Sequence, residues 1–154
     1  MNRIIVATTP NWAATGLRVT LGSVLFAHGA QSLLGWFGGF GFTSTMQYLT
    51  GVEGLPWLIG LLVISLQFFG SLLLLIGLGT RLMAFATFFL FVGMILTSHL
   101  DYGFFMNWSS TQKGEGFEYH LLVLGMCTAL AVLGGGAFSV DRQLEKSILR
   151  NPHS

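Results

Sequence analysis

The stretch LPWLIGLLVISLQFFGSLLLLIGL, residues 55–78, decides the fold class of this chain. It contains no Asp, Glu, Lys or Arg. A helix that crosses a bilayer needs about 20 predominantly apolar residues, so the stretch is long enough. Runs such as residues 71–78 do not alternate between apolar and polar side chains, which argues against a transmembrane β-strand. Because backbone groups in hydrocarbon have no water to bond, the stretch predicts a membrane-spanning helix.

Three further segments have the same character. Charge-free runs cover residues 19–52, 82–100 and 119–140. Together they predict four spanning helices, at residues 12–34, 55–78, 82–100 and 117–134. We therefore expect one all-α domain over residues 1–154, an integral membrane four-helix bundle with a polar tail at 139–154.

The composition supports a chain that is dissolved in lipid. Of the 154 residues, 53% are hydrophobic and 8% are charged, where about 25% charged is ordinary for soluble domains. The formal net charge of +1 excludes a nucleic-acid-binding module, because no basic surface can be assembled. A single cysteine, Cys127, excludes an intramolecular disulfide framework.

The basic residues predict the orientation of the bundle. Those on one side of a four-helix path are Arg3, Arg18, Arg81, Arg142, Lys146 and Arg150. Only Lys113 falls on the other side. By the positive-inside rule both termini and the turn at 79–81 are cytoplasmic, and the loops at 35–54 and 101–116 face outward. We expect a multi-pass protein of the bacterial inner membrane, with Arg81 as a cytoplasmic anchor and Arg18 either snorkelling as another or paired inside.

Polar side chains in the apolar segments mark a candidate pocket in the outer half of the membrane, where ionisable groups usually face protein or water. The candidate residues are His28, Gln31, Gln67, His99, Glu118 and His120. Neutral imidazoles can ligate a metal or haem, or hydrogen-bond a quinone carbonyl. Each histidine can equally cap a helix end or bond a loop carbonyl. No local ligand spacing supports a metal site, so none is assigned.

Glu118 shares a helix face with the small residues Gly125 and Thr128, and this face is expected to point into the bundle. The candidate partners of Glu118 are then His28, Gln67 and Tyr119, of which His28 is nearest in depth. His120 points about 200° away from Glu118, because two residues turn a helix that far. Gln67 is interpreted as a packing contact, and no nucleophile–base arrangement assigns a catalytic residue.

These residues resemble the DoxX family of small four-helix membrane proteins. The resemblance rests on Arg18, Gly22, Phe26, His28, Gly29, Gln31 and Leu33, with GWFGGFG at 35–41, GLGTRLMA at 77–84, GFEYHLL at 116–122 and GGGAFSVD at 134–141. It covers most of residues 16–141 and implies an inner-membrane bundle. Relatives include a quinone-reducing subunit of thiosulfate oxidation and partners of membrane redox or thiol-stress complexes. Where similar proteins often have a Glu, this chain has Gln67, which weighs against proton-coupled chemistry at that position.

Three functions are open on this basis. The first is a non-catalytic subunit or accessory factor of a larger membrane redox complex. The second is a quinone-interacting oxidoreductase component, in which His28, Glu118 and His120 orient the headgroup. A small transporter is a weaker third. The expected partners are the lipid bilayer and a larger membrane protein complex, and quinone is the cofactor that the second reading allows.

Overall fold

The computed structural model describes residues 7–150, and within this range every regular element is helical, as the sequence predicts. The elements in chain order are α2 (Trp12–Leu34), η1 (Trp36–Gly38), α3 (Gly41–Gly51), α4 (Trp57–Ser65), η2 (Leu66–Gly70), α5 (Ser71–Ile76), α6 (Thr80–Met94), η3 (Ile95–His99), η4 (Leu100–Tyr102), α7 (Glu118–Leu133) and α8 (Val140–Arg150). Arg3, which entered the orientation argument, lies outside the described residues.

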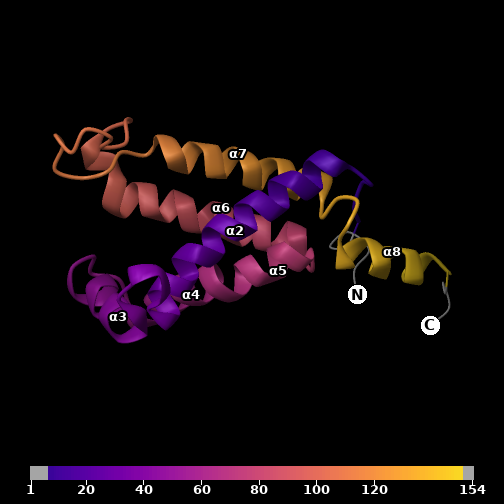
Figure 1. Ribbon diagram of the computed structural model, residues 1–154, viewed down its shortest axis with the longest axis horizontal. Helices are drawn as coiled ribbons and strands as arrows, with labels where there is room; N and C mark the ends of the chain where they lie inside the picture. Colours follow the sequence, from indigo (N-terminus) through magenta and orange to yellow (C-terminus); the bar gives the residue numbers. More distant parts are fainter. Residues whose placement is uncertain (1–6, 151–154) are drawn as a thin grey trace.

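The long helices lie side by side along one axis (Figure 1). The helices α4, η2 and α5 follow one another directly, as do α6, η3 and η4. The helix α2 packs against η2 and α5 and also against α7, while α6 packs along α7. We call the end with α3 and the loop at residues 103–117 the loop end. The opposite end, with the start of α2, the turn at 77–79 and α8, is the terminal end.

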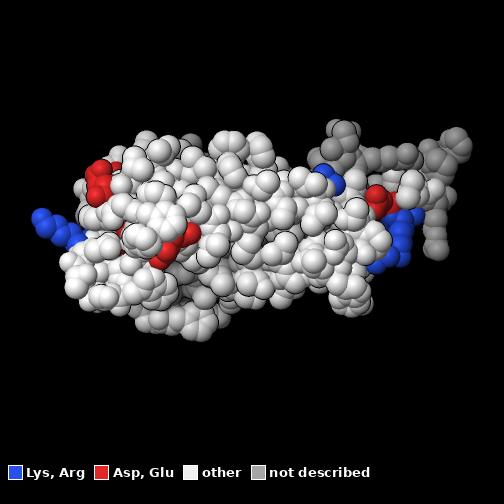
Figure 2. Space-filling view, turned by 90° about the horizontal axis from the view of Figure 1, so that it is seen from above, with Lys and Arg blue, Asp and Glu red and all other residues white. Residues whose placement is uncertain are grey.

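Two of these helices are long and apolar enough to cross a membrane, Trp57–Ile76 and Thr80–Tyr102. The helix α7, at Glu118–Leu133, is a shorter apolar helix. Charged side chains lie at the two ends of the face seen in Figure 2, and the broad middle carries none. This distribution matches a molecule whose middle is surrounded by hydrocarbon.

Burial follows the pattern of a membrane protein, with large apolar side chains outside and polar ones inside. Exposed apolar side chains along the helices include Val24, Leu58, Leu62, Phe69, Leu72, Phe85, Phe89, Leu96 and Leu122. Buried polar or charged side chains include Arg18, Gln67, Ser71, Thr80, Thr87, His120, Ser139 and Asp141. Soluble monomers rarely expose contiguous apolar surface on this scale, so lipid is the natural solvent for the helix surfaces.

Gly29 allows α2 to touch the π-helical turn η2. A Cβ atom at this position would lie 2.5 Å from the backbone nitrogen of Phe68 and 2.6 Å from the carbonyl oxygen of Gln67. Both neighbours are backbone atoms, so they cannot rotate away as a flexible side chain can. Only glycine therefore permits this crossing, which holds Gln67 in the interior at 9% exposure.

Arg18 closes the terminal end from the inside. Its side chain is only 2% exposed. Nε donates to the Gly135 carbonyl at 3.0 Å, and the terminal nitrogens donate to the carbonyls of Leu74, Leu75 and Phe138. The last carbonyls of a helix have no partner within it, so one guanidinium supplies them at the end of α5. Arg18 is thus a buried link between segments and not the snorkelling anchor that the sequence allowed.

Arg81 and Asp141 also form hydrogen bonds to unpaired backbone groups at helix ends. Arg81 donates to the Ala131 and Val132 carbonyls at the end of α7, each at 2.9 Å. The carboxylate of Asp141 accepts from the backbone N–H groups of Gly79 and Thr80, at 2.7 and 2.8 Å, where α6 begins. A cation at a helix C-terminus and an anion at an N-terminus also complement the helix dipole.

Two glycines of α2 provide a test of the helix crossing. Gly29→Ala is expected to lower thermal stability in detergent by about 1–3 kcal/mol, because the new methyl group meets fixed backbone. Gly16→Ala is the matched control, since a Cβ there meets nothing within 4 Å. Its better helix propensity should leave stability equal or raise it by up to about 1 kcal/mol. Melting curves followed by circular dichroism measure both, and equal curves for the two variants would contradict the crossing.

Candidate functional site

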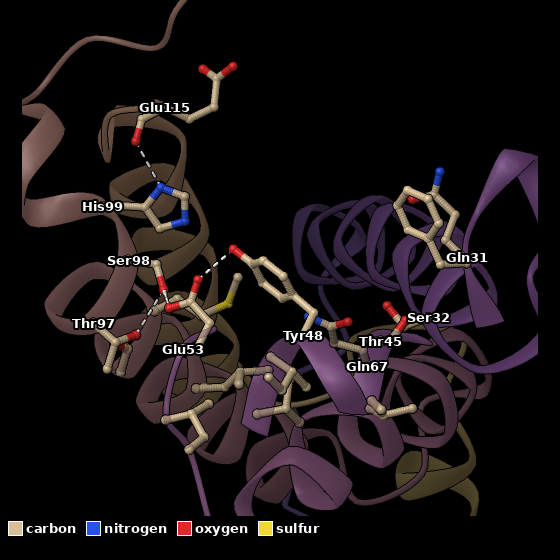
Figure 3. Close-up of a pocket in the computed structure, with 18 of the residues that line it drawn as sticks. Gln31, Ser32, Thr45, Tyr48, Glu53, Gln67, Thr97, Ser98, His99 and Glu115 are labelled. Carbon is tan, nitrogen blue, oxygen red and sulfur yellow. Dashed lines mark hydrogen bonds between the residues drawn. The ribbon is translucent and has the colours of Figure 1, made fainter. Parts of the chain in front are cut away.

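A cavity of about 1000 Å³ opens at the loop end between α2, α3, α4 and the α6–η3 helix. Its apolar walls come from Leu49, Leu55, Ile59, Val63, Ile64, Phe89, Leu90 and Met94. Its polar side chains, labelled in Figure 3, are Gln31, Ser32, Thr45, Tyr48, Glu53, Gln67, Thr97, Ser98, His99 and Glu115. A large apolar space with a few convergent polar groups is the usual form of a small-molecule site.

The carboxylate of Glu53 is held in place at the cavity by two side-chain hydrogen bonds. It accepts a hydrogen bond from the Tyr48 hydroxyl at 2.6 Å and another from the Ser98 hydroxyl at 2.5 Å. The bond from Ser98 joins the loop after α3 to η3, and the bond from Tyr48 joins the same loop to α3 (Figure 3). The bonds from Ser98 and Tyr48 lower the pKa of Glu53, and the bond to Glu53 raises the pKa of Tyr48. The carboxylate therefore stays charged at neutral pH.

His99 stands next to this carboxylate at the cavity wall (Figure 3). Its Nδ1 lies 2.9 Å from the Glu115 carbonyl oxygen. On its other side the ring faces His120, with the two ring centroids 4.1 Å apart. His120 is only 4% exposed, packs against Phe91, and its Nδ1 has no hydrogen-bond partner. The two histidines thus form a pair of which one faces the cavity and one the interior.

The structure places some of the predicted pocket residues at the cavity and others elsewhere. Gln31, Gln67 and His99 line the cavity, and His120 lies directly behind His99. His28 is exposed on the outside of α2 and does not line the cavity. The three histidines of the outer half therefore do not converge as a set.

Glu118 has partners other than the predicted His28. It accepts from the backbone N–H of Met106 at 2.9 Å and from the indole N–H of Trp108 at 3.0 Å, so it holds the loop before α7. The expected inward face of α7 was also wrong, because Gly125 and Thr128 are exposed. The face of α7 that points inward carries His120, Val123, Cys127 and Leu130.

Sequence reasoning missed Tyr48, Glu53 and Ser98. One signal for Glu53 was available, since it is the only charged residue between positions 19 and 80. Tyr48 and Ser98 carry no comparable signal. The role of Ser98 depends on a contact between distant segments, and that of Tyr48 depends on the path of the loop after α3. In the part of the chain that the structure describes, no group of three or more His, Cys, Asp or Glu side chains is placed to hold a metal ion.

The fold and cavity define an all-helical protein with a lipid-compatible surface and a ligand-sized cavity at one end. The DoxX family matches residues 13–100. The chain is also similar to inner membrane protein YqjF of Escherichia coli (strain K12), with 35% identity over 113 residues, 73% of this chain and 81% of that protein. No solved structure matches. The chain belongs to the DoxX family, as the resemblance in its sequence predicted.

The charge of Glu53 should make a pH-dependent contribution to stability. Its pKa is below the ordinary value of 4.5 in the folded chain, so its stabilising effect is present above that pH and is lost as the pH falls through the folded pKa. Glu53→Gln should therefore lower the melting temperature at pH 7, and the difference from the parent chain should shrink as the pH falls below 4.5.

Asp101→Asn is the control for this experiment, because Asp101 is exposed at the same end of the molecule. Its melting temperature should follow that of the parent chain at every pH. A deficit of Glu53→Gln that stays constant down to pH values well below 4.5 would show that ionisation of Glu53 is not what stabilises the loop end.

Proposed function

We propose that the protein binds a lipid-soluble molecule of the quinone class, oxidised or reduced, in the cavity at the loop end. The observation that carries the proposal is the cavity itself, about 1000 Å³ with mostly apolar walls and one polar cluster around Glu53 and His99. Its size lies at the upper end of the range for sites of drug-sized molecules. An aromatic headgroup fits between the apolar walls, and its oxygen substituents meet the polar cluster.

The proposed setting is the bacterial inner membrane. The membrane location named for the Escherichia coli relative supports it, as do the two candidate spans and the charge-free middle of the surface. In this proposal α2 and α7 cross with those two helices and complete a four-helix bundle. Among the Lys and Arg residues that the structure describes, only Lys113 lies at the loop end and the others lie at the terminal end, which supports cytoplasmic termini and a cavity at the outer side.

A role as subunit or accessory factor of a membrane redox complex is the second part of the proposal. The exposed face of α7 supports it, because Gly125 and Thr128 lie there and a Cβ at Gly125 would meet nothing within 4 Å. Small residues on a lipid-facing helix let another helix approach closely. The protein would then hold the quinone-class molecule beside a larger partner.

The two parts of the proposal are separated by two glycine variants. Gly93 lines the cavity and a Cβ there meets nothing within 4 Å, so the side chain of Gly93→Phe begins in open space and is expected to occupy part of the cavity. It should weaken binding of decylubiquinone and of its quinol by roughly tenfold or more, because the ligand loses its room. Gly125→Phe, on the outer face of α7, is the matched control and should bind as the parent chain does.

Binding is measured by equilibrium dialysis with the full chain in lipid nanodiscs. Co-purification from native membranes then tests the partner. Here Gly125→Phe should lose associated proteins that Gly93→Phe retains, because only the former blocks the small-residue face. Undiminished ligand binding by Gly93→Phe would refute the cavity as the site, and identical associated proteins for both variants would refute the α7 interface.

A further inference from the structure

The hydroxyl hydrogens beside Glu53 are already committed within the protein. The hydroxyls of Tyr48 and Ser98 donate to Glu53 at 2.6 and 2.5 Å. The neighbouring Thr97 hydroxyl donates to the Gly93 carbonyl at 3.0 Å. Each of these side chains carries a single O–H donor. What remains free on Glu53 is the capacity to accept, since two carboxylate oxygens offer about four lone-pair positions and the structure fills two.

His99 also offers a free acceptor, because its hydrogen bond to the Glu115 carbonyl decides which ring nitrogen carries the proton. The Glu115 carbonyl oxygen, 2.9 Å from Nδ1, has no hydrogen to give, so Nδ1 must be the donor. In a neutral imidazole the second nitrogen then carries a lone pair. Nε2 of His99 is on the cavity side of the ring in Figure 3. The ring is held in this orientation by the Glu115 carbonyl and by the ring of His120, which packs against it at a tilt of 48° with the centroids 4.1 Å apart.

The free groups at this end of the cavity are therefore hydrogen-bond acceptors, and a ligand binds to them by donating hydrogen bonds. A quinone carbonyl can only accept a hydrogen bond. Its lone pairs would therefore face the lone pairs of Glu53 and His99, and these groups would repel each other. A hydroxyl group on an aromatic ring donates and satisfies either group. Donors also line the cavity, namely the amides of Gln31 and Gln67, the hydroxyls of Ser32 and Thr45, and the ammonium group of Lys113. Those of Gln31, Ser32, Thr45 and Gln67 lie on the other side of Tyr48 from His99 in Figure 3, so the acceptors define only the end of the cavity with Glu53 and His99.

We propose that the cavity selects the reduced, hydroxylated form of its ligand, a hydroquinone or a related phenol, and that Nε2 of His99 accepts the hydrogen bond from the ring hydroxyl. This inference rests on the proposed function, because it names the form of the quinone-class molecule that the same cavity takes. Glu53 lies close enough to serve as a second acceptor. His99 is a binding residue in this assignment, and no bond is made or broken.

The test compares two forms of one molecule in the parent chain. Decylubiquinol, kept reduced under argon, should bind roughly tenfold more tightly than decylubiquinone in equilibrium dialysis with nanodiscs, about the effect of one hydrogen bond. A second pair, 4-octylphenol and its methyl ether 4-octylanisole, repeats the comparison without redox chemistry. The phenol should bind more tightly, because the ether lacks the donor.

Variants then assign the preference to a residue. His99→Phe keeps a ring of similar size and removes the acceptor. It should weaken quinol binding and relieve the lone-pair repulsion against decylubiquinone, so the preference for quinol should be erased. His28→Phe is the matched control outside the cavity and should keep the preference. His99→Gln retains a side-chain acceptor and should restore part of it, which also covers the case in which His99→Phe does not fold.

The outcomes separate the two proposals. If neither form binds and neither phenol nor ether binds, the proposed function fails. If both forms bind and the quinone binds equally or more tightly, the selection for a donor is overturned while the site stands. If His99→Phe weakens quinol and quinone by the same factor, His99 only packs against the ligand, and its assignment as acceptor is wrong.

Discussion

The structure depends on one constraint, that polar backbone groups at helix ends must find partners inside the molecule. Hydrocarbon offers no water, and an unpaired carbonyl there costs several kcal/mol. Arg18 meets this constraint for carbonyls of Leu74, Leu75, Gly135 and Phe138 with one side chain. Asp141 and Arg81 do the same where α6 begins and α7 ends. A buried arginine is tolerated here because each of its bonded nitrogens replaces a water that the carbonyls lack.

The terminal end is held together by these hydrogen bonds, and the cavity lies at the opposite, loop end. Gly29 brings α2 against the backbone of Gln67, whose side chain lines the cavity, and α3 and the loop carrying Glu53 supply further parts of the cavity wall. Polar groups at the loop end bond one another across elements, through Glu53 to Ser98 and through His99 to Glu115. The acceptor positions of Glu53 and His99 that these bonds leave free are available to a ligand. The same rule, that every buried donor and acceptor needs a partner, thus accounts for the tight end and predicts the chemistry of the open one.

Much of the architecture could be predicted from the sequence, because charge-free runs report the solvent of a helix directly. The predicted helix at 12–34 coincides with α2, and the family could be predicted from local motifs such as His28-Gly29, which lies in the segment 13–100 that the DoxX family matches. The site was harder. Periodicity places Gly125 and Thr128 on one helix face with Glu118, but it does not say whether that face points to protein or lipid. For the same reason His28 was expected near the pocket and is exposed. The contact of Glu53 with Ser98 depends on how the loop after α3 meets η3, which no local spacing encodes.

The central claim is that this bundle crosses the membrane with its arginine-rich end in the cytoplasm and its cavity at the outer surface. Single cysteines at the exposed positions Ser109 and Ser147, in a Cys127→Ala background, test it directly. In intact spheroplasts a membrane-impermeant maleimide should label Ser109→Cys, while Ser147→Cys should react only after the membrane is opened. Labelling of Ser147→Cys in intact cells, with Ser109→Cys protected, would contradict the orientation. Reaction of both without lysis would contradict the crossing pattern of the helices.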